Sequence, residues 1–361
     1  MKRNHDISTG RPTPILTFSL TSQNTMTNLV MTLLLLYLTP AFCSCSEEES
    51  YTDPSGATCL RETIPTTIYI KSIPGGGTLD FFTFNDDRLR RLDSYQRIES
   101  FSGGKVNVSS RTGSKIMVAI ANLRAGEEEI DRILSYDDLL LLHSELSDED
   151  TSRPVMSGEA VVEAGKGSFS LKLEPLLAEI RLNSIRCNFK GRPYEDSRLE
   201  DVKVYLTNIC SRYPVAGPAP EYPESIINQG GYSEQDMAST GNPGAVSGEI
   251  PEGIGSGILY PDINLYCYPN SAVEEGPGTP FTRMVIEGTL DGDRTYYPIN
   301  INREEGDAGA SGVHRNMSYK YDITITRRGV DDPDTPVAVD MIGIPMFIEE
   351  WNGKSHRTIT Y

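Results

Sequence analysis

The side chains that most often carry out chemistry are few in this sequence and lie far apart. Its histidines are His5, His143, His314 and His356, and none has a second metal ligand or general base four residues later. The sequence therefore lacks the H-E-x-x-H pattern of a zinc protease. It also lacks the G-x-S-x-G turn of a serine hydrolase and the P-loop of a nucleotide-binding protein. We expect no enzyme activity and no cofactor.

The residues that come nearest to a ligand site have simpler explanations. Asp331, Asp332 and Asp334 lack the loop pattern and distal glutamate of a calcium site, which favours a solvated turn. Gly75–Gly77 follows a strand but precedes no helix, so it is expected to be a turn and not a phosphate cradle. His314 is expected to be structural. We therefore predict no metal site.

Cysteine chemistry points instead to a lipid anchor near the N-terminus. Leu29–Leu38 is apolar but much shorter than the ~20 residues of a membrane-spanning helix, which is typical of a signal peptide. Ser44 precedes Cys45 in a pattern that resembles a lipobox, whereas bulky Phe42 precedes Cys43. We predict a signal peptide over residues 1–44, with Met26 or Met31 as alternative starts, and acylation at Cys45. A cleaved signal without lipid is the alternative.

The residues after Cys45 indicate where the protein is delivered. Ser46–Glu49 is acidic and resembles the export tag of surface-exposed Bacteroidetes lipoproteins. Several acyl chains together anchor a protein stably in a membrane. We expect residues 45–61 to be a lipidated acidic tether, and outer-membrane lipid to be a partner through the acyl chains.

The composition restricts the fold and the partners of the remainder. The 361-residue chain carries a net charge of −18, which repels phosphate backbones and excludes nucleic acid as a partner. It contains 32 Gly and 23 Pro among short β-branched runs, which favours a mainly β, turn-rich fold. Cys59, Cys187, Cys210 and Cys267 are expected to be either disulfides of unknown pairing or buried thiols.

Alternating residues and turn signals predict strands along the first part of the chain. Helical spacing follows Glu127–Glu129 and continues over Asp137–Leu146. Gly165–Gly167 is expected to join two strands as a hairpin. The predicted strands are Thr67–Ile70, Leu79–Phe84, Leu92–Ile98, Val106–Val108, Ile116–Ala121, Gly158–Ala164 and Ser168–Leu173.

The second part of the chain shows the same alternation around one long interruption. Residues from Ser211 to Gly257 have no periodicity and predict a long loop. Asp291–Gly292 predicts the turn of a hairpin. The predicted strands are Ala178–Ile185, Val202–Leu206, Asn264–Tyr268, Met284–Glu287, Thr295–Ile299, Tyr319–Thr326 and Met346–Trp351.

The order of these elements resembles the fimbrillin superfamily of Bacteroidales fimbriae, which includes the major and minor fimbrial subunits. The resemblance extends from about Thr67 to Tyr361. Its sharpest part is Val313–Ile323, in which Arg315 and Asn316 precede Tyr319 and an aromatic-rich strand. Weaker matches are Leu79–Asn85, Ser114–Asn122, the helix Tyr136–Leu146 and Ala178–Ile185.

The resemblance implies two tandem transthyretin-like β-sandwich domains, over residues 62–175 and 176–361, with a short helix in the first. It implies a structural subunit of a fimbrium (a stalk, anchor or accessory subunit) whose partners are other fimbrial subunits, either copies of itself or paralogues. Assembly in this family exchanges strands. Here the strand that leaves would be Thr67, Ile68, Tyr69 and Ile70. The donor would be the tail from Trp351 to Tyr361, including Thr358 and Ile359. An ordinary edge strand is the alternative.

One departure from the family concerns proteolytic trimming. Stalk subunits of the best-known type are cut by an arginine-specific protease between the first two strands, but no Arg or Lys occurs between Ser72 and Asp87. Arg61 and Arg88 lie outside that interval, which leaves a differently triggered subunit, or an untrimmed anchor or accessory subunit that keeps its lipid. The rival hypothesis is a surface lipoprotein that binds a glycan or a host or bacterial surface protein through residues 211–257.

Overall fold

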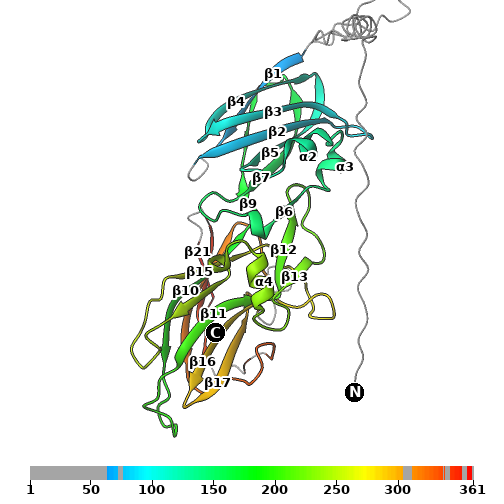
Figure 1. Ribbon diagram of the computed structural model, residues 1–361. Coiled ribbons are helices and arrows are strands. Elements are labelled where there is room, and N and C mark those ends of the chain that lie inside the picture. Colours follow the sequence, from blue (N-terminus) through cyan, green and yellow to red (C-terminus); the bar gives the residue numbers. More distant parts are fainter. Residues whose placement is uncertain are drawn as a thin grey trace, which may run out of the picture. The chain divides into compact units, whose positions relative to one another are not determined.

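The computed structural model describes residues 63–71, 76–303, 311–335, 337 and 342–351, together with the backbone of His356–Ile359. The predicted signal peptide and tether lie outside these residues, and so do Cys45, Cys59 and Tyr361. Within the described part of the chain, no helix has the length and apolar character needed to cross a membrane. The described residues fold mainly into β-strands, as predicted (Figure 1).

A first β-sandwich is built from two sheets. Its strands are β1 (Thr63–Ile70), β2 (Gly77–Asn85), β3 (Leu92–Phe101), β4 (Gly104–Arg111), β5 (Gly113–Ala121), β7 (Met156–Ala164), β8 (Ser168–Leu171) and β9 (Glu174–Pro175). The larger sheet has the order β3-β2-β5-β7-β9, and the smaller has the order β4-β1-β8. Because β1 pairs antiparallel with β4 and parallel with β8, it is the middle strand of the smaller sheet.

The core of this sandwich is formed by alternate side chains of both sheets, as the period of a β-strand requires. Its members are Ile68, Ile70, Leu79, Phe81, Phe101, Val106, Val108, Met117, Ala119, Ala121, Met156, Leu171 and Leu173. Ile68 and Ile70 of β1 are each at most 3% exposed. Burial of one such side chain stabilises a fold by roughly 1.5–3 kcal/mol, so β1 is an integral part of this core.

Two short helices pack on the opposite face of the larger sheet. α2 (Glu127–Asp131) and α3 (Tyr136–Leu139) bury Ile130 and Leu139 in one cluster with Phe82 and Val118. The sequence prediction of a helix as far as Leu146 was wrong. α3 ends at Leu139, and His143–Glu145 (β6) instead pairs with β12 (Ile209–Pro214), so tertiary pairing overrides the local helical spacing.

The turn Gly165–Gly167 does not form the predicted hairpin. β7 pairs with β5 and β9, whereas β8 pairs with β1, so the turn carries the chain from one sheet to the other. Gly165 and Gly167 have φ values of 78° and 84°, which are left-handed conformations that favour glycine. The alternation of both strands was predicted correctly, but their pairing was not.

The second sandwich follows the same plan. Its strands are β10 (Ala178–Cys187), β11 (Glu200–Thr207), β14 (Ser247–Ile250), β15 (Ile263–Cys267), β16 (Arg283–Leu290), β17 (Asp293–Asn300), β18 (Met317–Ile325), β19 (Ile342–Gly343), β20 (Met346–Glu350) and β21 (His356–Ile359). One sheet has the order β15-β10-β18-β20-β21 with β19 beside β18, and the other has the order β14-β11-β16-β17. The predicted Asp291–Gly292 hairpin is confirmed, with positive φ at both residues as in a type I′ turn.

The segment predicted as one long loop contains ordered elements. β13 (Glu224–Ile227) joins β12 and β6 in a small sheet, and α4 (Glu234–Ser239) and a 3-10 turn at Pro243–Ala245 follow. A second 3-10 turn, Leu146–Asp148, lies outside this segment and follows β6. Asn228 is fully buried and left-handed, and its side chain donates to the Leu206 carbonyl and accepts from Ser233 N–H. Elements this short, held by side-chain hydrogen bonds, leave no periodicity in a sequence.

The described cysteines are thiols and not disulfides. Cys187, Cys210 and Cys267 are free and buried. Burial raises the pKa of Cys187 to about 12 and that of Cys210 to about 11. Because the thiolate is the reactive form, these side chains act as small core residues at neutral pH.

Candidate strand-exchange site

β1 contains all four residues predicted to leave the fold. Ile68 and Ile70 point into the core, whereas Tyr69 is 48% exposed on the outer face. Half-buried Thr67 donates from Oγ1 to Oδ1 of Asn107 on β4 at 3.1 Å. β1 is bonded on both sides, by β4 and by β8, and is therefore not an edge strand of its sheet.

Removal of β1 would have two consequences at once. The facing edges of β4 and β8 would lose their backbone partners, and the apolar side chains beneath Ile68 and Ile70 would be uncovered. Unpaired backbone groups beside an apolar groove are the conditions under which an extended segment adds to a sheet. The space occupied by β1 is thus a groove with the dimensions and chemistry of one strand.

A polar contact also holds β1 near its N-terminal end. Thr66 is 1% exposed, and its Oγ1 accepts a hydrogen bond from Gly165 N–H at 3.1 Å. A Cβ added to Gly165 would lie 2.0 Å from Cδ1 of Ile64, so the turn after β7 packs directly on β1. Sequence reasoning missed this contact, because Gly165 was interpreted only as part of a hairpin turn.

Lys71 is a further residue that the search for a protease site overlooked. It directly follows β1, and it is exposed. A basic residue therefore does lie between the first two strands, immediately before the interval Ser72–Asp87 that lacks one. Cleavage after Lys71 would separate β1 from β2 without removing any residue of either strand.

The tail residues are found at the end of the second sandwich. Thr358 and Ile359 belong to β21, which pairs antiparallel with β20 and is the last strand in its sheet. The Trp351 ring lies 5.4 Å from that of Tyr266 and is half-buried. The structure does not bring β1 and β21 together, since they belong to different sheets.

Arg315 connects the two sandwiches. Its Nη2 donates to the Ser157 carbonyl at 3.0 Å and to Ser157 Oγ at 3.1 Å, and its Nε donates to the Pro175 carbonyl at 3.2 Å. No carboxylate forms an ion pair with it among the described residues, and burial lowers the pKa of Arg315. The arginine binds β7 and β9 through their backbone.

Asn316 and Tyr319 complete this structural junction. Asn316 has a left-handed φ of 61°, its N–H donates to the Leu177 carbonyl, and its carbonyl accepts from Trp351 N–H. Fully buried Tyr319 donates to the Gly312 carbonyl and accepts from His314 N–H. The family-like motif therefore fixes the start of β18, and His314 has the structural role that was expected.

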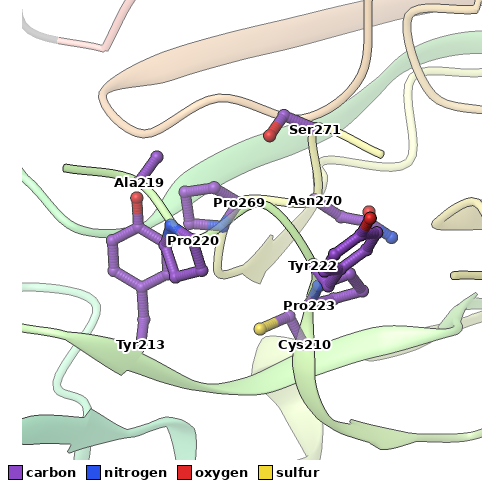
Figure 2. A pocket seen from close by; sticks show the side chains of 9 residues that line it. All are labelled: Cys210, Tyr213, Ala219, Pro220, Tyr222, Pro223, Pro269, Asn270 and Ser271. Carbon is purple, nitrogen blue, oxygen red and sulfur yellow. The ribbon is translucent and has the colours of Figure 1, made fainter. Parts of the chain in front are cut away.

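The segment 211–257 was the predicted location of a binding surface in the rival hypothesis. Figure 2 shows a hollow beside this segment, lined by Tyr213, Pro220 and Tyr222 of the segment and by Cys210 and Pro269 from outside it. Its free volume of about 10 Å³ admits one water molecule and no sugar ring. Hollows near Arg198 and near His143 measure about 220 and 180 Å³, below the ~300 Å³ of an ordinary small-molecule site.

Chemistry-bearing side chains do not converge elsewhere in the described residues. There, no group of three or more His, Cys, Asp or Glu side chains is placed to hold a metal ion. Nε2 of His143 lies 3.4 Å from a Glu224 carboxylate oxygen, and Nδ1 contacts the Leu141 carbonyl at 2.7 Å. These partners fix the ring of His143 in place within the structure.

Comparison with known structures identifies the class of fold. No protein-family model matches the sequence, and no curated protein matches it. Among solved structures, a protein from Parabacteroides distasonis superposes with a TM-score of 0.61 at 14% identity, covering 82% of this chain and 99% of that one. The two tandem transthyretin-like β-sandwiches predicted from the sequence are thereby confirmed as the fold.

Two further structures carry descriptive names. A fimbrilin (fimA) from Porphyromonas gingivalis has a TM-score of 0.60 at 15% identity, covering 81% of this chain and 99% of that one. The tip fimbrial protein Mfa3 from the same organism has a TM-score of 0.51 at 14% identity, covering 80% and 100%. The chain therefore has the fold of Bacteroidales fimbrial proteins, as its resemblance implied.

Proposed function

We propose that this chain is a structural, non-catalytic subunit of a cell-surface fimbrium, as a stalk, anchor or accessory protein. In this proposal it is exported to the outer membrane as a lipoprotein acylated at Cys45, and residues 62–175 and 176–361 are its two domains. Neighbouring subunits join by β-strand complementation: β1 leaves its groove, a neighbour's strand replaces it, and the tail Trp351–Tyr361 is donated onward.

The observation that carries this proposal is the position of β1. It is the first strand of the described chain and the middle strand of its sheet, and it covers the core with Ile68 and Ile70. Exposed Lys71 directly follows β1 and is a candidate position for proteolytic cleavage. The fold shared with fimbrial proteins supports the same assignment.

Mass spectrometry of surface-sheared material tests the proposal. A mature N-terminus at Ser72 or beyond, in high-mass material, is the result expected of a trimmed stalk subunit. An acylated Cys45 in cell-bound fibres is expected of an anchor. Monomeric protein with β1 intact and no association with any fibre would refute the proposal.

A truncation tests the donor role of the tail separately. Deletion of residues 352–361 removes β21 but leaves Trp351 and β20 in place. We expect the truncated protein to reach the surface and to stop forming high-mass oligomers with its neighbours. If oligomers persist, donation by the tail is wrong.

The rival function, capture of a glycan or host protein, is less well supported. The three hollows described above are smaller than an ordinary ligand site, and the one beside residues 213–223 has room for no more than a water molecule. A glycan array with the full chain, compared with a variant shortened within 217–222, is the matching test. Binding that depends on those residues would support the rival.

A further inference from the structure

The groove filled by β1 is apolar at one end and polar at the other. Beyond Ile68 and Ile70, the inward-facing positions of the surrounding strands change from aliphatic to polar. Register and burial identify these inward-facing polar residues as Thr66, Thr83, Ser94, Ser110 and Lys115. The occupant of the groove therefore meets different chemistry along its length.

Hydroxyl groups at the polar end lack partners while β1 is in place. Oγ1 of Thr83 and the Oγ atoms of Ser94 and Ser110 are buried and form no hydrogen bond with any described residue. Ile64 lies directly opposite Ser110 in the pairing of β1 with β4, and its side chain offers no hydrogen bond. Unpaired buried hydroxyls destabilise a fold, so β1 is an imperfect occupant at this end.

The neighbouring position, by contrast, is satisfied by a hydroxyl. Thr66 is 1% exposed, and its Oγ1 accepts a hydrogen bond from Gly165 N–H. A valine there would occupy the same volume but leave that N–H unpaired. Lys115 faces the same space from β5, where it is 2% exposed and its Nζ lies 3.1 Å from Asp93 Oδ2. A positive side chain at the Thr66 site would be buried there without an acceptor atom for Gly165 N–H.

We propose, on the basis of the strand complementation proposed above, that the strand replacing β1 comes from a different fimbrial subunit and carries a defined side-chain pattern. Alternate residues of this replacing strand face into the groove. The first of them has a hydrogen-bonding side chain and takes the Ile64 site, and the next is Ser or Thr and takes the Thr66 site. Large aliphatic residues follow at the sites of Ile68 and Ile70. Such a strand pairs Ser110, keeps the Gly165 contact and fills the apolar end, so it binds more tightly than β1.

This chain's own tail does not carry that pattern. Residues 351–361 can be laid along the groove in either chain direction. In each direction, one placement puts apolar side chains at both the Ile68 and Ile70 sites, and both placements use Ile359 and Tyr361. In one orientation Arg357 falls at the Thr66 site, where a guanidinium cannot accept the hydrogen bond from Gly165 N–H. In the other, residues 351–361 supply side chains for the two apolar sites alone, with neither polar site filled. This tail segment is therefore a poor donor, and a paralogous subunit is the partner that fits.

Peptide competition tests the pattern. A specific protease site is inserted after Lys71 in the full chain and cleaved, so that β1 remains bound without a covalent link. Labelled octapeptides of the β1 sequence then compete for the groove. We expect the Ile64→Thr peptide to bind at least as tightly as the native peptide, and Thr66→Val to bind about tenfold more weakly. Weaker binding of Ile64→Thr, or unchanged binding of Thr66→Val, would overturn the pattern.

Two further peptides are the matched controls. Ile68→Thr makes the same chemical change at the apolar end and should weaken binding by about a hundredfold, because it buries a hydroxyl among aliphatic side chains. The tail peptide Lys354–Tyr361 should bind more weakly than the native peptide. Tail binding as tight as that of the native peptide would overturn the assignment to a different subunit.

A measurement on the uncut chain separates this inference from the proposed function. If no peptide enters the groove, strand exchange at β1 is wrong, yet the polar end can still be tested by thermal unfolding. There, Ile64→Thr should leave the Tm unchanged or higher, and Ile68→Thr should lower it by about 5 °C or more. An equal decrease in Tm for the two variants would show that both ends of the groove tolerate a hydroxyl equally poorly, and would overturn the inference.

Discussion

Arg315 binds Ser157 across the junction of the two sandwiches, donating from Nη2 to the Ser157 carbonyl at 3.0 Å and to its hydroxyl at 3.1 Å. The arginine precedes β18, whereas Ser157 lies in β7, the neighbour of β5 in the first sandwich. One guanidinium thus binds the sheet that faces β1 to the second sandwich.

Replacement of Arg315 should weaken this junction. Arg315→Met keeps much of the side-chain volume but leaves the Ser157 and Pro175 carbonyls without their donor, which should lower the free energy of unfolding by about 3 kcal/mol. Arg315→Lys should recover only part of the loss, because an ammonium group lacks the planar fork of donors. Urea unfolding measures both. Arg132→Met, at an exposed residue with one i,i+4 ion pair, is the control and should cost less than about 0.5 kcal/mol.

The turn Gly165–Gly167 offers a matched pair of substitutions. Both glycines have left-handed φ, so alanine at either is strained by about 1 kcal/mol. Only at Gly165 does the added Cβ also meet Ile64, at 2.0 Å from Cδ1, whereas nothing lies within 4 Å at Gly167. We expect Gly165→Ala to be the more destabilising and to speed hydrogen exchange in β1. Equal effects of the two substitutions would mean that this turn does not hold β1.

Glu149 should make stability depend on pH. It is 8% exposed and accepts hydrogen bonds from Tyr268 OH, Ser144 Oγ and Val155 N–H, yet burial raises the pKa of its carboxyl. A pKa that is higher in the folded than in the unfolded protein gives a stabilisation that is complete at low pH. It is lost as the pH rises through the folded-state value.

Glu149→Gln removes this titration. The stability of the Gln variant relative to the natural protein should therefore improve as the pH is raised from about 5 to about 8. Urea unfolding at several pH values gives the two curves. Parallel curves would show that Glu149 titrates alike in the folded and unfolded states.

The strands could be predicted where alternation is strong and a turn residue marks the end. β2, β5, β10 and the Asp291–Gly292 hairpin were found in this way, because local sequence specifies both burial and chain reversal. The pairing of β8 with β1 was not, because Gly165–Gly167 looks the same whether it closes a hairpin or crosses between sheets. That β1 is the middle strand of its sheet could be recognised only from the structure.

The polar end of the groove could not be predicted from the sequence, for a related reason. Thr83 and Ser110 each look like an ordinary polar residue of a half-exposed strand. Only the register of β1 with β4 and of β2 with its neighbours shows that they face inward. The site residues Thr67–Ile70 were found through the family resemblance, whereas Thr66, Gly165 and Lys71 required the structure.

In the proposed assembly, β1 must leave its groove before the subunit can join a neighbour. Thr67 lies opposite Asn107 on the outer face, within the Cα separation that a disulfide tolerates between paired antiparallel strands. A Thr67→Cys/Asn107→Cys variant would tie β1 to β4 without touching the core. The described native cysteines are buried thiols, so reductant acts on the new bond.

Fibre assembly by this variant, with and without reductant, is the most direct measurement. We predict that the oxidised protein reaches the surface but forms no high-mass oligomers, and that reduction restores them to the level of the Thr67→Cys single variant. Oligomers that form equally well with the disulfide closed would contradict strand exchange at β1.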